Sequence, residues 1–480
     1  MCSRAGIRRR RAPVRARTGS TVIGRLSSLL RRVAGRLLPA RLRPGMGGLA
    51  QDLYDDAMYQ FEIEEYQEAE ILFRKCIAMD ERNADALNDL GRTLSRLERK
   101  EEALECYQRA VAANPRFVGS QRNIALMLEE LDRIDEAEEA FRKAIKIEPK
   151  YVQAHHNLAL LLEKQDRDEE ALRALQRCTE LDPENANFHY DHGHALQRMA
   201  RFDESVVAYK KGLGALIELV GHFPRKDFDD GAEQGFDHDR AGEALLDIQK
   251  VFAQLERPFF LAFGTALGAI REGGLLSHDQ DLDIGFWRDG DSNRVAEAFL
   301  AEGFTLTEYN MSDTLLDDGL SRIPLRHPNG IYIDAFPRMR EDDGQVWCCL
   351  NEGATRLAWS HETFGLREVE MSGSSFNVPN PPERYLDEYF GPDWRQRDLF
   401  FEGTVNAHNL VGGFPPIARS YAWYFMMRRL LNREWQGGRY LFDFLCEKFP
   451  DDAELQGFRP AFDEADHEVV HARTYGSADA

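Results

Sequence analysis

The feature that most constrains the fold is self-similarity at a period of 34 residues between residues 51 and 217. Small residues recur in two registers, where they let paired helices approach closely, and a large residue in a third register packs between the helices. Prolines end successive repeats at Pro115, Pro149 and Pro183. The pattern predicts about five helix pairs. The three registers are Ala57, Gly91, Ala125, Ala159 and Gly193; Ala69, Ala103, Ala137, Ala171 and Ser205; and Phe73, Tyr107, Phe141, Leu175 and Tyr209.

This pattern resembles the tetratricopeptide repeat. The resemblance implies an α-solenoid over residues 46–220, with a concave surface that binds a peptide or a partner protein. In the register of that family, the inner positions lack the lysine-rich lining with which chaperone adaptors capture a terminal carboxylate. These partner-groove positions are Tyr54, Asn88, Arg122, His156 and Tyr190.

A second motif lies between Phe260 and Phe286, where glycines precede aspartates at the alternate positions Asp279, Asp281 and Asp283. On a strand, side chains two residues apart share one face, so the three carboxylates would form a tight acidic cluster. Two carboxylates about 4 Å apart repel by roughly 4 kcal/mol at an effective dielectric constant near 20. A hard divalent cation relieves this repulsion, and carboxylate oxygens suit Mg²⁺ or Mn²⁺. Phosphoryl transfer is therefore the leading chemistry.

Other sites with similar residue types do not fit. An EF-hand loop beginning at Asp279 needs Gly at its sixth position and Glu at its twelfth, and the chain has Ile284 and Gly290 there. The glycines from Gly264 to Gly274 match neither a Walker loop nor a dinucleotide-binding fingerprint.

Three blocks in this half resemble the LicD/fukutin family of phosphotransferases, within the polymerase-β-like nucleotidyltransferase superfamily. The first joins Gly264–Arg271 to Asp279–Ile284, the second is Ile331–Pro337, and the third runs from Val378 to Trp394. The resemblance covers roughly residues 240–400 and implies an α/β (α+β) nucleotidyltransferase-like domain with a mixed sheet. The chain departs from the family at Ser277-His278, where Pro-Trp is frequent, and at Phe263, where a second glycine is frequent.

The resemblance assigns roles to the acidic residues. Asp281 and Asp283 map on the metal-holding pair, Asp334 on the third carboxylate, and Asp279 on an auxiliary catalytic acid. On the strand around Asp334, Tyr332 would share its face. The expected substrate-binding residues are Gly264 and Thr265 in a phosphate-binding turn, Gly268, Arg271 as a phosphate partner, and His278 beside the cleft.

The resemblance also implies the activity. We expect an enzyme (EC 2.7.-) that uses Mg²⁺ or Mn²⁺ to transfer a phosphorylated alcohol, phosphocholine or a polyol phosphate, from a CDP-type donor to a glycan or glycoconjugate. The repeats would recruit a partner or the acceptor. Two alternatives stay open: a nucleotidyltransferase that modifies a protein target, and a non-catalytic scaffold with a degenerate transferase domain.

Charge separates the first 45 residues from the rest. They contain 13 arginines and no lysine, aspartate or glutamate, whereas the remaining residues carry 48 basic and 82 acidic side chains. A body with a net charge of −34 is a poor partner for nucleic acid. The leader has three interpretations: a basic amphipathic helix over Thr21–Leu42, a disordered segment, or an untranslated stretch before a start at Met46. We favour the last two.

The remaining segments complete the domain organisation. Residues 221–240 have the glycine, proline and aspartate content of a linker, residues 241–400 form the transferase domain, and residues 401–480 a helical extension. Aromatic residues between Ser420 and Phe449 would form the core of a helical cap or, alternatively, a rim for the acceptor. Seven cysteines without regular spacing indicate a reducing compartment, and no apolar run reaches the length of a membrane span. We therefore expect a cytoplasmic protein, with peripheral membrane contact left open.

Overall fold

The computed structural model divides into two compact units at Ala140 and Phe141, and each unit is described by itself. The basic leader and most of the expected linker lie outside the described residues. No helix in the part of the chain that the structure describes is long and apolar enough to cross a membrane. The described residues are 48–220, 237–276, 281–288, 293–307, 322–352, 355–396, 401, 403–405, 407–410 and 414–465.

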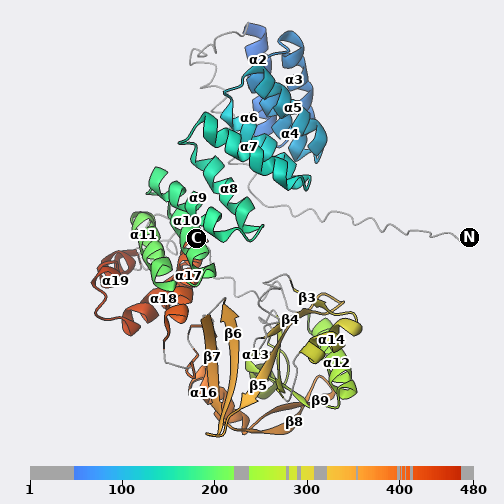
Figure 1. Ribbon diagram of the computed structural model, residues 1–480, viewed down its shortest axis with the longest axis vertical. Helices are drawn as coiled ribbons and strands as arrows, with labels where there is room; N and C mark the ends of the chain where they lie inside the picture. The colour runs from blue at the N-terminus through green and yellow to red at the C-terminus, as the bar shows by residue number, and fades with distance from the viewer. Residues whose placement is uncertain are drawn as a thin grey trace, which may run out of the picture. The chain divides into compact units, whose positions relative to one another are not determined.

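Helices α2 to α11 form the five predicted pairs (Figure 1). The turn inside each pair contains one residue in the left-handed region, and these residues, Glu64, Glu98, Asp132, Asp166 and Ala200, have φ between 55° and 65°. The expected α-solenoid of helix pairs is confirmed. The helices are α2 Gly48–Glu62, α3 Tyr66–Met79, α4 Ala84–Arg96, α5 Lys100–Ala113, α6 Val118–Glu130, α7 Ile134–Ile147, α8 Val152–Glu163, α9 Asp168–Leu181, α10 Ala186–Arg198 and α11 Phe202–Val220.

The packing inside a pair explains the recurring sizes in the three registers. A Cβ added to Gly91 would lie 2.6 Å from the ring of Tyr107, and a Cβ added to Gly193 would lie 2.5 Å from the ring of Tyr209. Real Cβ atoms do not approach a ring so closely, so the aromatic residue of the second helix packs directly on the backbone of the first. Both tyrosine side chains are almost fully buried.

A sixth helix pair follows near the C-terminus, formed by α17 Pro416–Leu431 and α18 Trp435–Lys448. Its turn contains Arg433 with a φ of 67°, matching the turn residues of the other pairs. Relative to that residue, Gly438, Phe442 and Pro450 occupy the second small, the large and the closing proline positions. The first small position holds Met426 instead. The repeat geometry therefore resumes after the α/β region.

The sixth pair packs on the fifth. Side chains of α11, including Leu213 and Leu216, share one buried core with α17 and α18, in which Trp423 is fully buried. The hydroxyl groups of Ser205 and Ser420 lie 2.6 Å apart. Lys210 of α11 forms an ion pair of 2.8 Å with Asp452, the N-cap residue of the short helix α19 Ala453–Gly457. The α/β region is thus inserted in the chain between two helix pairs that contact each other.

The α/β region is built on a mixed sheet with the order β1-β2-β5-β4-β3, in which β2 and β5 are parallel and the other neighbours are antiparallel. Strand β6 extends the sheet from the end of β5, and β7 pairs with β6. The expected mixed sheet is confirmed. The strands are β1 Phe259–Leu261, β2 Asp281–Trp287, β3 Thr305–Leu306, β4 Ile323–Arg326, β5 Tyr332–Arg340, β6 Gln345–Glu352 and β7 Thr355–Glu362, with a separate hairpin of β8 Gly365–Met371 and β9 Ser374–Asn380.

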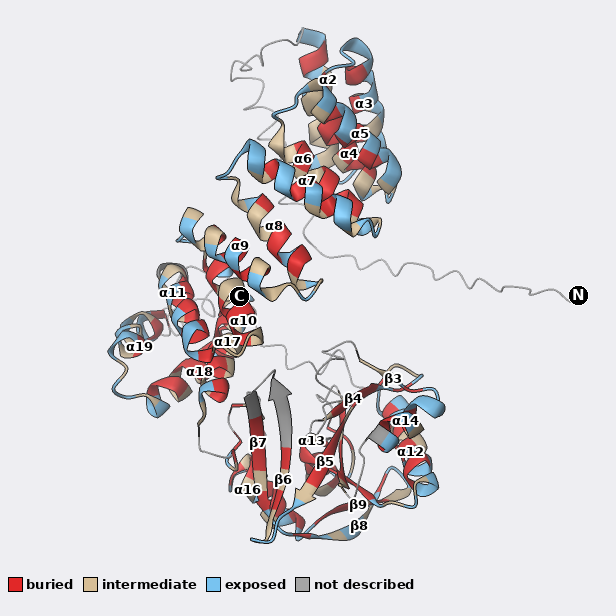
Figure 2. Ribbon diagram, viewed as in Figure 1, coloured by how far each residue is buried: buried red, intermediate tan, exposed pale blue. Residues whose placement is uncertain are grey.

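The described helices of this region are α12 His238–Gln254, α13 Phe263–Arg271, α14 Asn293–Ala301 and α16 Pro382–Phe390. Burial alternates at the start of β2 as the sequence predicts, with Leu282 and Ile284 in the core and Asp281 and Asp283 half-buried. Figure 2 shows that most of β5 is buried. On β5, Ile333 is buried while Tyr332 is exposed. The two strands therefore present their polar faces on the same side of the sheet.

Candidate active site

The parallel pairing of β2 with β5 brings three carboxylates together. Asp283 lies directly opposite Asp334, and Asp281 lies opposite Tyr332. Asp281, Asp283 and Asp334 each offer one oxygen within 4.8 Å of the oxygens of the other two, and all three residues are half-buried. The polar faces of two neighbouring strands thus form one acidic cluster.

Asp283 is held by the first turn of α13. The backbone N–H of Gly264 donates to Oδ2 of Asp283 at 3.1 Å, and the N–H of Asp283 donates to the buried Thr265 hydroxyl at 2.8 Å. The sequence analysis assigned these two residues to phosphate binding. In the structure their described contacts orient a carboxylate of the cluster.

Phe263, the first residue of α13, has a φ of 40°, which is unfavourable for a residue with a Cβ. Such conformations cost on the order of 1–3 kcal/mol and persist where the surroundings impose them. The Phe263 ring packs between Phe336, at 4.9 Å, and Tyr389, at 4.5 Å between centroids, and its N–H donates to the Tyr385 hydroxyl at 3.3 Å. The left-handed φ explains why glycine is suited to this position.

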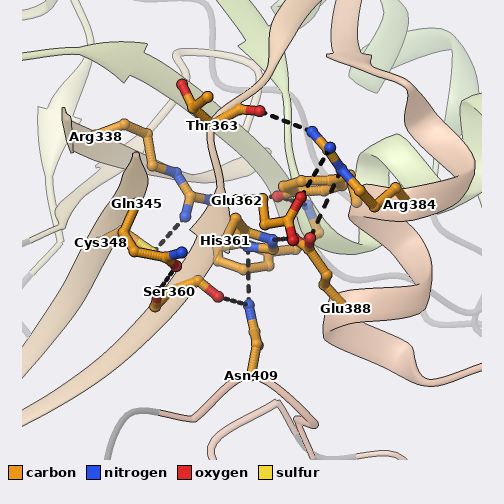
Figure 3. Close-up of polar contacts among 12 residues, drawn as sticks. Arg338, Gln345, Cys348, Ser360, His361, Glu362, Thr363, Arg384, Glu388 and Asn409 are labelled. Carbon is orange, nitrogen blue, oxygen red and sulfur yellow. Dashed lines mark hydrogen bonds and ion pairs between the residues drawn. The ribbon is translucent and has the colours of Figure 1, made fainter. Parts of the chain in front are cut away.

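A fully buried arginine, Arg338, lies on β5, the strand that carries Asp334. Figure 3 shows its polar contacts. Arg338, on β5, donates to the sulfur of Cys348 and, at 3.3 Å, to the Tyr385 hydroxyl. Its guanidinium carbon lies 4.5 Å from the centroid of Phe263. Burial lowers the pKa of Arg338, but Cys348, the nearby tyrosines and Asp283 raise it, and the net pKa is above the ordinary value. Arg338 is therefore a permanent positive charge that offsets the charge of the carboxylates.

His361 forms a polar network beside Arg338 (Figure 3). Its Nδ1 lies 3.1 Å from a carboxylate oxygen of Glu388, and its Nε2 lies 3.1 Å from the amide nitrogen of Asn409. Burial, and then the charge of Arg338, hold the pKa of His361 well below its ordinary value. A neutral ring that donates from Nδ1 and accepts at Nε2 satisfies both contacts. His361 is a hydrogen-bonded group of the interior.

A cavity of about 820 Å³ opens beside the carboxylates. Asp281 and Asp334 line one side, and Arg322, Arg326 and Tyr332 line another. Sequence reasoning missed both arginines. The signal was their spacing: Arg322 and Arg326 lie four residues apart along the strand next to β5, where Pro324 pairs with Asp334 and Arg326 with Tyr332.

The other expected substrate residues lie elsewhere or outside the described residues. A Cβ on Gly268 would lie 2.6 Å from the carbonyl oxygen of Gly274, so Gly268 is needed for close backbone packing. Arg271 donates to the carbonyl oxygen of Trp394 at 3.3 Å and does not line the cavity. His278 and Asp279 belong to a segment that the structure does not describe.

The positions assigned to the partner groove form contacts between neighbouring repeats. In the first unit, the Tyr54 hydroxyl donates to Asp89, and the Asn88 side-chain oxygen accepts from Ser120 at 2.9 Å. Arg122 is half-buried in the same unit.

In the second unit, His156 contacts Asp191 at 2.8 Å. Tyr190 stacks on Tyr424 of the sixth helix pair at 5.5 Å between centroids. Both positions therefore support contacts between helix pairs.

The acidic cluster fits a hard divalent cation. Its donors are oxygens only, and three carboxylates this close repel one another unless a cation or a proton neutralises them. Arg322 forms an ion pair with Asp334, which shows that the cluster attracts positive charge. Carboxylate oxygens favour Mg²⁺ or Mn²⁺ over softer metals.

Comparison with known proteins agrees with this architecture. Residues 256–381 match the LicD/FKTN/FKRP nucleotidyltransferase domain, and residues 54–116, 88–152 and 128–190 match tetratricopeptide repeats. The chain therefore carries a LicD-type nucleotidyltransferase domain and, in its N-terminal region, tetratricopeptide repeats. Both expected resemblances are confirmed.

A curated relative matches part of the chain. Over 158 residues the chain is 25% identical to the ribitol-5-phosphate transferase FKTN of Mus musculus, and the match covers 32% of this chain and 33% of that protein. The chain thus spans about a third of the length of this relative.

Two solved structures are similar to part of the chain. The MamA protein of Desulfovibrio magneticus RS-1 is 16% identical, with a TM-score of 0.32, over 36% of this chain and 97% of that chain. A thermophilic tetratricopeptide protein of Thermus thermophilus is 21% identical, with a TM-score of 0.30, over 35% of this chain and 91% of that chain.

Proposed function

We propose that this protein transfers a phosphorylated alcohol, phosphocholine or a polyol phosphate, from a CDP-type donor to a hydroxyl group of a glycan or glycoconjugate. The observation that carries the proposal is the cluster of Asp281, Asp283 and Asp334 on two parallel strands inside a LicD-type domain. The matched relative, which is named for ribitol-5-phosphate transfer, supports this class of donor.

The chain's own residues would supply position and charge. Asp281, Asp283 and Asp334 would hold Mg²⁺ or Mn²⁺, with Asp279 as an auxiliary acid. When bound, the cation would neutralise the diphosphate and the charge that develops on the CMP leaving group. The hydrogen bond from Gly264 keeps the Asp283 carboxylate oriented, and buried Arg338 limits the repulsion within the cluster.

The reaction exchanges one phosphorus–oxygen bond for another. The bond between the phosphorus of the alcohol phosphate and the oxygen of the CMP leaving group breaks, and the oxygen of the acceptor hydroxyl forms a new bond to that phosphorus. The proton of the acceptor hydroxyl passes to a carboxylate of the cluster. In this chemistry, positioning and charge contribute more than proton removal.

The repeats would act in recruitment. We propose that they bind a protein or peptide partner, or the acceptor, and that the carboxylates of the α/β region act on the acceptor's hydroxyl group. We also propose a cytoplasmic location, with peripheral membrane contact as an alternative.

The test is a panel of CDP-alcohols with Mg²⁺ or Mn²⁺, followed by thermal shift and by product mass. A donor that binds the folded protein raises its melting temperature. Transfer of the alcohol phosphate, with release of CMP, supports the proposal. Transfer of CMP itself to a protein would establish the nucleotidyltransferase alternative.

A control variant makes the assay specific. Asp283→Asn should lose turnover, while Asp342→Asn, at an exposed position in the turn between β5 and β6, should retain it. If no CDP-alcohol shifts the melting temperature or reacts, the scaffold alternative replaces the proposal.

A further inference from the structure

The cavity beside the carboxylates has two oppositely charged sides. Asp281 and Asp334 stand on β2 and β5, Arg322 directly precedes β4, and Arg326 is the last residue of β4. Arg322 forms an ion pair with Asp334, and its side chain is 29% exposed. The Arg326 guanidinium carbon lies 5.3 Å from the ring centroid of Tyr332, and Arg326 has no carboxylate partner among the described residues.

This charge pattern depends on what neutralises Asp334. A divalent cation held by Asp281, Asp283 and Asp334 would compete with Arg322 for the same carboxylate. Once the cation takes Asp334, that carboxylate no longer neutralises Arg322, and Arg322 and Arg326 present two positive charges to the cavity that they line. An anion between them and the cation would then be favourable, because guanidinium groups bind phosphate oxygens through charge-assisted, often bidentate hydrogen bonds.

We propose that Arg322 and Arg326 bind a phosphate group of the substrate, and that Arg322 exchanges Asp334 for this phosphate when the divalent cation binds. The inference rests on the proposed function, because it assigns a phosphate subsite to the same cavity. The Arg326 guanidinium lies over the Tyr332 ring, and both residues line the cavity.

Two substrates offer this chemistry. The phosphate belongs either to the diphosphate of the nucleotide donor or to an acceptor that already carries a phosphate ester. Both would present a doubly or singly charged oxygen group to the arginines, and binding probes distinguish them.

The first measurement is Mn²⁺ binding to the full-length protein without nucleotide, by titration calorimetry. Arg322→Gln removes the competing cation from Asp334, so we expect Mn²⁺ to bind about tenfold more tightly. Arg326→Gln should leave Mn²⁺ affinity unchanged, as should the control Arg367→Gln on the exposed hairpin strand β8. Weaker or unchanged Mn²⁺ binding by Arg322→Gln would overturn the exchange.

The second measurement is binding of inorganic pyrophosphate and of glycerol 3-phosphate to the Mn²⁺-loaded protein. Both Arg322→Gln and Arg326→Gln should weaken binding of one probe by about tenfold, while Arg367→Gln leaves it unchanged. A loss confined to pyrophosphate identifies the donor diphosphate as the ligand, and a loss confined to glycerol 3-phosphate identifies a phosphorylated acceptor. If neither probe weakens in either variant, the phosphate subsite is refuted.

These outcomes separate the inference from the proposed function. A merely structural role of Arg322 would weaken Mn²⁺ and phosphate together, whereas the exchange predicts opposite signs for the two affinities. If both affinities change as expected but no CDP-alcohol is turned over, the phosphate subsite stands and the proposed donor is wrong.

Discussion

The helix pairs and the α/β region both pack tightly, but they obtain their contacts differently. In a helix pair, Gly91 and Tyr107 meet across one short turn, and the same contact returns with Gly193 and Tyr209. In the α/β region, Asp283 meets Asp334 and Arg338 meets Tyr385 only through the tertiary fold. The helix pairs repeat the same contact between a glycine and an aromatic ring. The α/β region instead places the strained residue Phe263 and the buried charge of Arg338 close together. The stability of the helix pairs therefore depends on a repeated local contact, whereas the chemistry of the α/β region depends on residues that only the tertiary fold brings together.

The largest expected effect concerns the boundary between the two regions. A fragment of residues 237–465 lacks α11 and should expose the face of α17 that Val206, Leu213 and Leu216 cover. Burying three such side chains contributes roughly 5–9 kcal/mol as an upper bound. We expect this fragment to melt far below a fragment of residues 184–465, which keeps α10 and α11.

Calorimetry of the two fragments checks this expectation. Equal melting temperatures would mean that the sixth helix pair is stable without α11 and belongs structurally to the α/β region.

The second effect lies within the acidic cluster. Asp283→Asn keeps the shape of the side chain but removes the charge on which a cation depends. We expect turnover to fall on the order of 10³-fold, with the melting temperature maintained because a like-charge repulsion is removed. Rates and melting curves of the same preparation check both parts, and wild-type turnover would show that Asp283 acts only in the fold.

The third effect tests the packing of a helix pair. Gly91→Ala places a Cβ against the Tyr107 ring, and overpacking of this kind costs about 1–3 kcal/mol. Gly214→Ala, on α11, is a matched control, because a Cβ there meets nothing within 4 Å and should stabilise the helix by about 0.5–1 kcal/mol. Denaturant titration measures both. If Gly91→Ala lowers the free energy of unfolding and Gly214→Ala raises it, the aromatic neighbour determines that the residue at position 91 is small. Changes of the same sign would contradict this explanation.

The smallest effect concerns pH and the ion pair between Lys210 and Asp452. Burial raises the pKa of Asp452, but the hydrogen bonds and charges of Lys210, Leu455 and Arg419 together lower it by more, so the net pKa is depressed. A depressed carboxyl pKa stabilises the fold above the unfolded pKa near 4, and this stability is lost as the pH falls through the folded pKa.

Asp452→Asn should therefore lower the free energy of unfolding by about 1 kcal/mol at pH 7 and leave it unchanged at the acid end of the titration. Asp451→Asn, at an exposed position, serves as the control. A difference between wild type and Asp452→Asn that does not change with pH would rule out the ion pair as its cause.

The sequence predicts the helix pairs and the two polar strand faces because both follow from local periodicity. A period of 34 residues fixes the spacing of the turns, and alternation fixes which side of β2 and β5 is buried. The expected face of Asp334, with Tyr332 beside it, follows from the same rule.

The features that sequence reasoning missed depend on contacts between distant residues. The sixth helix pair is out of phase with the others, because an inserted region precedes it, and Met426 fills its first small position. The role of the Gly264 N–H toward Asp283 appears only when α13 and β2 meet. Arg322 and Arg326 become part of the cavity only because β4 pairs with β5.

The insertion of the α/β region between two contacting helix pairs also affects its unfolded state. While α11 and α17 remain packed, an unfolded α/β region is a closed loop of roughly 200 residues, tied at both ends. A tied loop has less conformational entropy than a chain with one free end, so the anchoring helices act on it as a crosslink does. The anchoring helix pairs therefore stabilise the inserted region by reducing the conformational entropy of its unfolded chain.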